Sequence, residues 1–144
     1  MSEENKRVVR RLIEEHYNRK NAALVSELFS SAVSLHTPDG VLTGLEGASG
    51  LLQGYATAFP DFRLTIDDLI AEGDRVVMRY AFTGTNLGRF GDVPATGKHV
   101  SVANAIGIYR LISGKVIEGH LSWDKYSLLQ QLGVLATDPA AANT

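Results

Sequence analysis

The sequence predicts an α+β domain in which helices pack on one face of a curled antiparallel sheet. The main observation is a change of period at Pro60. Before it, apolar residues recur with helical spacing, and after it they alternate with polar residues. Short turns join most of the later segments, and strands joined in this way must run antiparallel.

Helices and one hairpin are expected before Pro60. A first helix is predicted from Ser2 to Lys20, where the apolar positions fall on one face, and a short second helix at 22–29. An alternating segment, a Pro-Asp-Gly turn and a second short strand predict a hairpin at 32–44. A third helix is expected from Leu45 to Phe59, because the proline that follows cannot continue it.

Four strands and a last helix are expected after Pro60. The strands are predicted at 62–73, 74–88, 98–112 and 115–124, and the helix at 125–132. Together these elements predict a single domain over residues 1–133, with 134–144 as a frayed C-terminal tail.

Composition excludes several classes of function. A chain of 144 residues suffices for one domain with a real core. A net charge of -2 argues against partners such as nucleic acid or an anionic membrane. The chain has no cysteine, which excludes disulfides and thiolate sites and fits a cytoplasmic location. No signal peptide or membrane span is expected. The four histidines lack metal-ligand spacing, so no metal site is expected.

Side-chain alternation predicts which strand residues face a cavity under the helices. In the last strand one face carries Val116, Glu118, His120, Ser122 and Asp124. In the strand before it, the predicted pocket wall is Val102, Asn104, Ile106, Ile108 and Arg110. The opposite row is Ala103, Ala105, Gly107 and Tyr109. A β-bulge in either strand would invert part of this assignment.

The small outer row also predicts the state of assembly. It would leave a flat, partly apolar sheet face, which is costly to expose. A homodimer packed sheet to sheet about a two-fold axis would cover that face with a second copy.

Four segments carry a resemblance to a known family. They are FPDFRL, AEGDRVVMRYAFTGTNLGRFGDVPATGK, IYRLISGKVIEGH and WDKYSLLQQLG. Together they resemble the SnoaL-like polyketide cyclase family from the first helix to Gly133. The resemblance implies the cone-shaped α+β barrel shared with nuclear transport factor two, scytalone dehydratase and ketosteroid isomerases. It also implies aldol ring closure of a small hydrophobic polyketide-like substrate by acid–base chemistry, with no cofactor.

The same resemblance assigns the catalytic acid/base to Asp124, the acid that precedes LLQQLG. A carboxylate in an apolar pocket has a raised pKa, so it can take a proton from carbon and return it to an alkoxide. Asp124 has a second interpretation as the cap of the helix that follows it. The cavity also has a second interpretation, as a site that binds a ligand without catalysis, because the same fold serves non-catalytic ligand-binding proteins. The choice among cyclase, isomerase, dehydratase and hydroxylase stays open.

Six further residues are predicted to bind substrate or to support Asp124: Tyr17, His36, Phe59, Asn104, Arg110 and His120. Each also has a structural interpretation. The two aromatic residues can be core or wall, the arginine a salt bridge at the rim, and the asparagine the partner of a buried water. His36 can be a surface residue of the turn, and His120 can be part of the pocket wall. The other histidines, His16 and His99, are expected at the surface.

Overall fold

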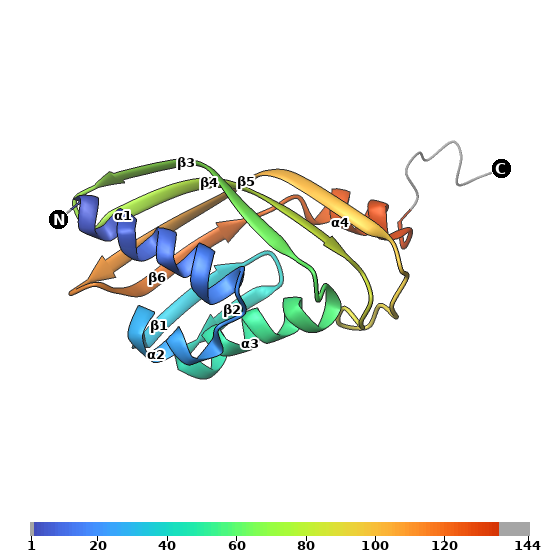
Figure 1. Cartoon of the computed structure of the whole chain (residues 1–144), viewed down its shortest axis with the longest axis horizontal. Coiled ribbons are helices and arrows are strands. Elements are labelled where there is room, and N and C mark those ends of the chain that lie inside the picture. The colour runs from blue at the N-terminus through green and yellow to red at the C-terminus, as the bar shows by residue number, and fades with distance from the viewer. Residues whose placement is uncertain (1, 136–144) are drawn as a thin grey trace.

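The computed structural model describes residues 2–135, which form a six-stranded sheet with helices on its concave face (Figure 1). The strands are β1 (Phe29–Thr37), β2 (Gly40–Thr43), β3 (Arg63–Glu72), β4 (Arg75–Thr85), β5 (His99–Ile112) and β6 (Lys115–Ser122). The predicted α+β class and the six predicted strands are confirmed. Most of the predicted tail, residues 136–144, lies outside the described part of the chain.

The sheet is mostly antiparallel, in the order β2-β1-β6-β5-β4-β3. The pair formed by β1 and β6 is parallel, and the other four pairs are antiparallel. The two edge strands, β2 and β3, do not pair with each other, so the sheet is strongly curved but open. The cone-shaped α+β barrel that the family resemblance implies is therefore open along one side.

The helical segments predicted before Pro60 are present. They are α1 (Ser2–Arg11) with a π-helical continuation η1 (Leu12–Tyr17), the short η2 (Ala22–Leu24) and α2 (Val25–Leu28), and α3 (Gly44–Ala58). The last helix, α4 (Lys125–Leu132), has the predicted bounds. Figure 1 shows α1 lying across β3 and β4, with α3 near the β1–β2 hairpin.

The first helix continues into a π-helical turn that contains His16. In η1 the amide of Asn18 donates to the carbonyl of Ile13, 2.9 Å away, so the turn holds one residue more than an α-helical turn. Both His16 and Tyr17 are buried, and His16 lies at helical spacing from the buried residues Leu12 and Ile13. His16 is 0 % exposed, so the predicted surface position is wrong.

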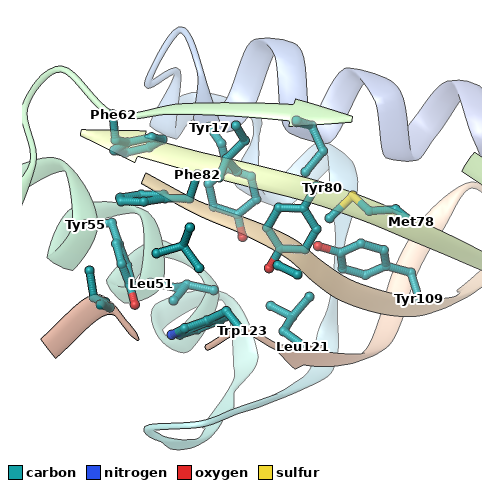
Figure 2. A pocket seen from close by; sticks show the side chains of 15 residues that line it. Tyr17, Leu51, Tyr55, Phe62, Met78, Tyr80, Phe82, Tyr109, Leu121 and Trp123 are labelled. Atoms are coloured by element: carbon teal, nitrogen blue, oxygen red, sulfur yellow. The ribbon is translucent and has the colours of Figure 1, made fainter. Parts of the chain in front are cut away.

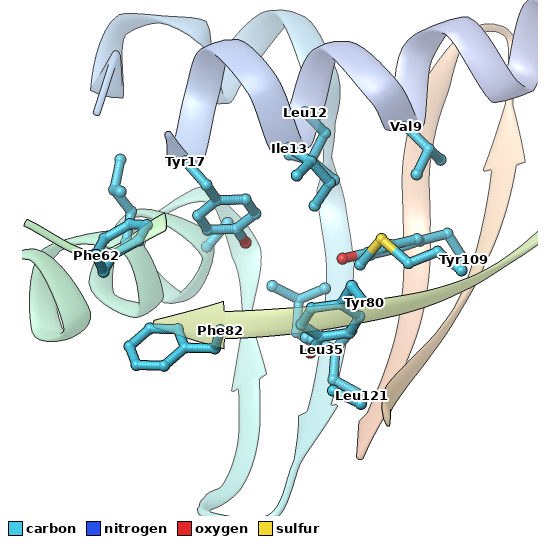
Figure 3. Close-up of a cluster of buried hydrophobic side chains, with 14 of the residues drawn as sticks. Val9, Leu12, Ile13, Tyr17, Leu35, Phe62, Tyr80, Phe82, Tyr109 and Leu121 are labelled. Carbon is cyan, nitrogen blue, oxygen red and sulfur yellow. The ribbon is translucent and has the colours of Figure 1, made fainter. Parts of the chain in front are cut away.

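The core lies between the helices and the concave face of the sheet (Figure 3). Val9, Leu12 and Ile13 reach down from the first helix toward the ring of Tyr109. That ring needs a glycine beside it, because a Cβ on Gly119 would stand 3.2 Å from it and 2.8 Å from the side chain of Leu35. Glycine in this strand therefore makes room for a large aromatic side chain.

Two bulges reverse the predicted faces of β5 and β6. In β5, Tyr80 pairs with Ala105 and Phe82 with Val102, so one extra residue is inserted, and Asn104 takes a φ of +58°. In β6 the register shifts between the partners of Arg110 and Leu111, which leaves Ile117 as the extra residue.

Beyond each bulge the side chains face the opposite way from the prediction. The inward residues are Ala105, Gly107, Tyr109, Gly119 and Leu121, and all five are buried. The side chains of Asn104, Ile106, Ile108, Arg110, Glu118, His120 and Ser122 lie on the outer face. The predicted inward position is correct for Val102 and Val116, which precede the bulges and are buried.

Candidate functional site

An inner cavity of about 70 Å³ lies between the N-terminal helices and the concave side of the sheet (Figure 2). Fifteen side chains line it: Ile13, Tyr17, Leu51, Tyr55, Phe62, Leu64, Met78, Tyr80, Phe82, Val102, Ala105, Tyr109, Leu121, Trp123 and Leu128. None of these fifteen is Asp, Glu, His, Lys or Arg. The wall is therefore apolar, and its polar groups are phenols and one indole.

Four tyrosines supply the phenols. Burial raises the pKa of Tyr17, Tyr55, Tyr80 and Tyr109 well above the ordinary range, and charge on neighbouring phenols raises it further for three of them. Each phenol therefore stays neutral and can donate a hydrogen bond at any physiological pH. Figure 2 shows the tyrosine hydroxyls directed into the space between the helices and the sheet.

Two polar atoms of this wall have no partner. Among the described residues, the Tyr55 hydroxyl and the Trp123 indole nitrogen are fully buried and make no hydrogen bond. Their rings meet edge to face with centroids 5.8 Å apart. In Figure 2 both atoms lie at the same end of the pocket. Most buried polar groups are paired, so two unpaired donors at one end of the pocket indicate a place for an acceptor.

A wider groove of about 830 Å³ adjoins this end of the cavity, and Leu51 and Tyr55 line both. The groove carries charge: Asp39, Arg89, Asp92 and Lys125 line it. Asp39 and Lys125 form an ion pair that links the β1–β2 turn to the start of α4. The Asp39 charge is the second cause, after burial, of the raised pKa of Tyr55.

Of the predicted site residues, Tyr17 lines the cavity and Phe59 lies just behind its wall. Phe59 is fully buried, and its ring packs edge to face on Phe82, with centroids 5.2 Å apart. It also lies 6.2 Å from the ring of Tyr55, so it supports two lining residues without being one itself.

Four predicted residues lie on the outer face of the sheet, so their predicted inward position is wrong. His36 and His120 stack with ring centroids 4.3 Å apart. Arg110 lies 3.8 Å from both Glu118 and Asp74, as its alternative interpretation as a rim salt bridge predicted. Asn104 accepts a hydrogen bond of 3.1 Å from Arg79. The bulges in β5 and β6 are the physical reason for the outward position of Asn104, Arg110 and His120.

Asp124 is the N-cap of α4. Its carboxylate accepts a hydrogen bond of 2.9 Å from the backbone amide of Ser127, and the residue is exposed. The alternative interpretation as a helix cap is confirmed. Asp124 lines neither the cavity nor the groove, although its neighbour Trp123 lines the cavity. Its catalytic role stays a prediction.

Sequence reasoning missed most of the polar wall. Tyr55, Tyr109 and Trp123 were not predicted to contact a ligand. Aromatic residues at these positions are typical of an apolar core, and only the unpaired hydroxyl and indole nitrogen distinguish them from core. Over residues 2–135 the structure contains no cluster of three side chains suited to holding a metal ion. No helix within that range is long and apolar enough to cross a membrane.

Comparisons with known proteins agree with this fold. A family model described as SnoaL-like polyketide cyclase matches residues 7–132. No curated protein sequence matches the chain at a significant level. A solved structure of a candidate SnoaL-like polyketide cyclase from Jannaschia sp. CCS1 is 22% identical, with a TM-score of 0.85 over 94% of this chain and 95% of that one.

Two further solved structures come from Streptomyces. AclR from Streptomyces galilaeus, a candidate hydroxylase, is 27% identical, with a TM-score of 0.83 over 99% of this chain and 93% of that one. TsrD from Streptomyces laurentii is also 27% identical, with a TM-score of 0.82 over 92% and 97% of the two chains.

Proposed function

We infer a function from family membership, because the chain belongs to the SnoaL-like polyketide cyclase family. We propose that it binds a small, apolar, polyketide-like ketone in the inner cavity and converts it by cofactor-independent acid–base chemistry. The observation that carries this proposal is the wall itself: an apolar enclosure whose polar groups are neutral donors. Apolar pockets with a few converging polar groups are typical of small-molecule sites.

The donors suit ketone chemistry. Removing a proton next to a carbonyl places negative charge on the carbonyl oxygen, and fixed donors in a water-poor site stabilise that charge. Buried phenols can do this without being deprotonated themselves. The cavity of about 70 Å³ is smaller than the roughly 150 Å³ that holds a benzene ring. A ring can therefore enter only if wall side chains shift, and a larger substrate would extend past Tyr55 into the groove.

Asp124 is the proposed acid/base, on the strength of the family resemblance and of its position next to Trp123. In an aldol closure its carboxylate would take the proton from the activated carbon. The carbanion would then attack a second carbonyl, and the alkoxide formed would recover the proton. The Ser127 amide engages only one carboxylate oxygen, Oδ1, so Oδ2 is the oxygen that would take the proton. We expect Asp124→Asn to lower turnover on the order of 10²-fold. Turnover at the wild-type rate would leave Asp124 as a cap alone.

A second candidate function is binding without catalysis. One observation favours it specifically: no lining residue of the inner cavity ionises near neutral pH. Hydroxylase, isomerase and dehydratase chemistry are further alternatives. Incubating the protein in heavy water with an aryl monoketone separates the classes, because an acid–base enzyme exchanges the protons next to the carbonyl faster than buffer alone does and a binding protein does not.

The binding site can be tested through Trp123, the chain's one tryptophan. An aryl ketone that enters the cavity should quench its fluorescence. Ala105 lines the cavity, so Ala105→Leu should fill it and abolish the quenching. Ala103→Leu is the matched control, because this neighbour on the same strand is exposed. Equal quenching in both variants would show that the ketone binds elsewhere.

We also propose a homodimer that forms through the outer sheet face. The contact does not use the predicted row from Ala103 to Tyr109, because only Ala103 of that row points outward. Ile106 and Ile108 are each 38 % exposed on that face. Arg110 and Glu118 are 3.8 Å apart on the central strands β5 and β6, so a two-fold axis can set each opposite its complement. Ile108→Lys should give monomers in sedimentation if this is correct. The proposed cytoplasmic location is tested by cell fractionation.

A further inference from the structure

We propose that the Tyr55 hydroxyl and the Trp123 indole N–H together bind one acceptor oxygen of the ligand, a neutral carbonyl. This inference rests on the proposed function, because it assumes that the inner cavity is the binding site. It goes further by naming the two donors and the chemical group that they select.

The first observation is that both donors are unsatisfied. The hydroxyl oxygen of Tyr55 and Nε1 of Trp123 are buried, and neither has a hydrogen-bond partner among the described residues. An indole N–H can only donate. A buried donor without an acceptor is costly, and the cost is recovered when a ligand oxygen arrives. A ligand that offers only donors cannot satisfy Trp123.

The second observation is that both rings are held in place. Tyr55 projects from α3, and its ring contacts the rings of Phe82 and Phe90, with centroids 5.6 and 5.5 Å away. Trp123 follows the end of β6 and meets the Tyr55 ring at an interplanar angle of 88°. Figure 2 shows the oxygen and the nitrogen at the same end of the pocket, although the two residues come from different elements. The two donors are thus held in place before a ligand arrives.

The third observation concerns charge. Asp39 lies in the adjoining groove and faces Lys125, with which it is paired. Its negative charge acts on Tyr55, and together with burial it keeps the phenol protonated by raising its pKa. A carboxylate ligand at the same place would meet this anion, and the inner wall offers it no cation. A neutral carbonyl oxygen meets neither obstacle.

The test compares two ligands of nearly the same shape, indanone and indane, which differ in one carbonyl group. Binding is followed by Trp123 fluorescence and by calorimetry. The wild type should bind indanone about tenfold or more tightly than indane, because indane leaves both donors unpaired. Tyr55→Phe keeps the ring and removes one donor. It should lower that preference to roughly threefold or less while leaving indane affinity unchanged.

Two further variants complete the experiment. Trp123→Phe, followed by calorimetry alone, should lose the preference in the same way as Tyr55→Phe. Tyr126→Phe makes the same chemical change at an exposed tyrosine outside the cavity and should keep the full preference. Melting curves of all three variants show whether each is folded before affinities are compared.

The outcomes separate this inference from the proposed function. Equal affinity of the wild type for indanone and indane overturns the donor pair but leaves ligand binding in the cavity intact. A full ketone preference in folded Tyr55→Phe or Trp123→Phe also overturns it. If neither ligand binds, the proposed use of the cavity fails, and the donor pair fails with it.

Discussion

Acid should destabilise this protein through His16. The imidazole is fully buried, and Nδ1 lies 3.1 Å from the carbonyl oxygen of Asn21. A carbonyl can only accept, so Nδ1 carries the proton, and Nε2 is left buried without a partner. Burial lowers the pKa of His16 below its ordinary value of 6.5, although the bond to Asn21 partly opposes this. The folded state therefore holds this imidazole neutral.

The sign and size of the effect follow from proton linkage. Below about pH 6.5 the unfolded chain binds a proton at His16 that the folded chain does not, so stability falls as pH falls. The free energy of unfolding falls by at most about 1.4 kcal/mol per pH unit. It stops falling once the pH is below the lowered pKa of His16 in the folded state. Above about pH 6.5 both states are neutral, and His16 contributes no pH dependence.

Urea unfolding followed by circular dichroism measures this effect. Between about pH 6.5 and 5.5 the wild type should lose more stability than His16→Phe, by at most about 1 kcal/mol. This variant keeps an aromatic ring against Tyr17 and Phe29. His99→Gln, a change at an exposed histidine, should retain the wild-type slope. An identical pH dependence for the wild type and His16→Phe would refute the assignment of a buried neutral imidazole.

Substitutions at three further positions test the packing. Asn104→Gly should be neutral or stabilising, whereas Asn104→Val should cost about 1–2 kcal/mol in urea unfolding, because a β-branched residue resists a positive φ. Equal stabilities would count against the bulge. Gly119→Ala should lower the melting temperature, since its methyl group would stand 2.8 Å from Leu35; an unchanged melting temperature would mean that the neighbours yield freely. Tyr55→Phe, in the absence of ligand, should not destabilise the fold, because the hydroxyl has no partner to lose. A loss above about 1 kcal/mol would reveal an unseen partner.

Most of the fold was predictable from local patterns. The change of period at Pro60 separates the helical part from the long strands, and the bounds predicted for α4 are those found. Asp124 was recognisable as a cap because an acid stands directly before that helix. The open edge between β2 and β3 was not predictable, since closure depends on the curvature of the whole sheet.

The candidate site was less predictable, because one inserted residue reverses every side chain that follows it. The bulge in β5 has a faint signal, an asparagine inside a strand, where asparagine tolerates a positive φ. The bulge at Ile117 has none. Tyr55 and Trp123 look like core residues in the sequence, and their role depends on which partners they lack. That information exists only in three dimensions.

The most direct test of the central claim is a crystal structure of the protein soaked with bromoindanone, with the bromine located by its anomalous signal. We predict that the ring will lie in the inner cavity among Tyr17, Tyr80 and Tyr109. Its carbonyl oxygen should lie within about 3 Å of the indole nitrogen of Trp123. Bromine on the outer sheet face beside His36 and His120, with the inner cavity still empty, would contradict the account.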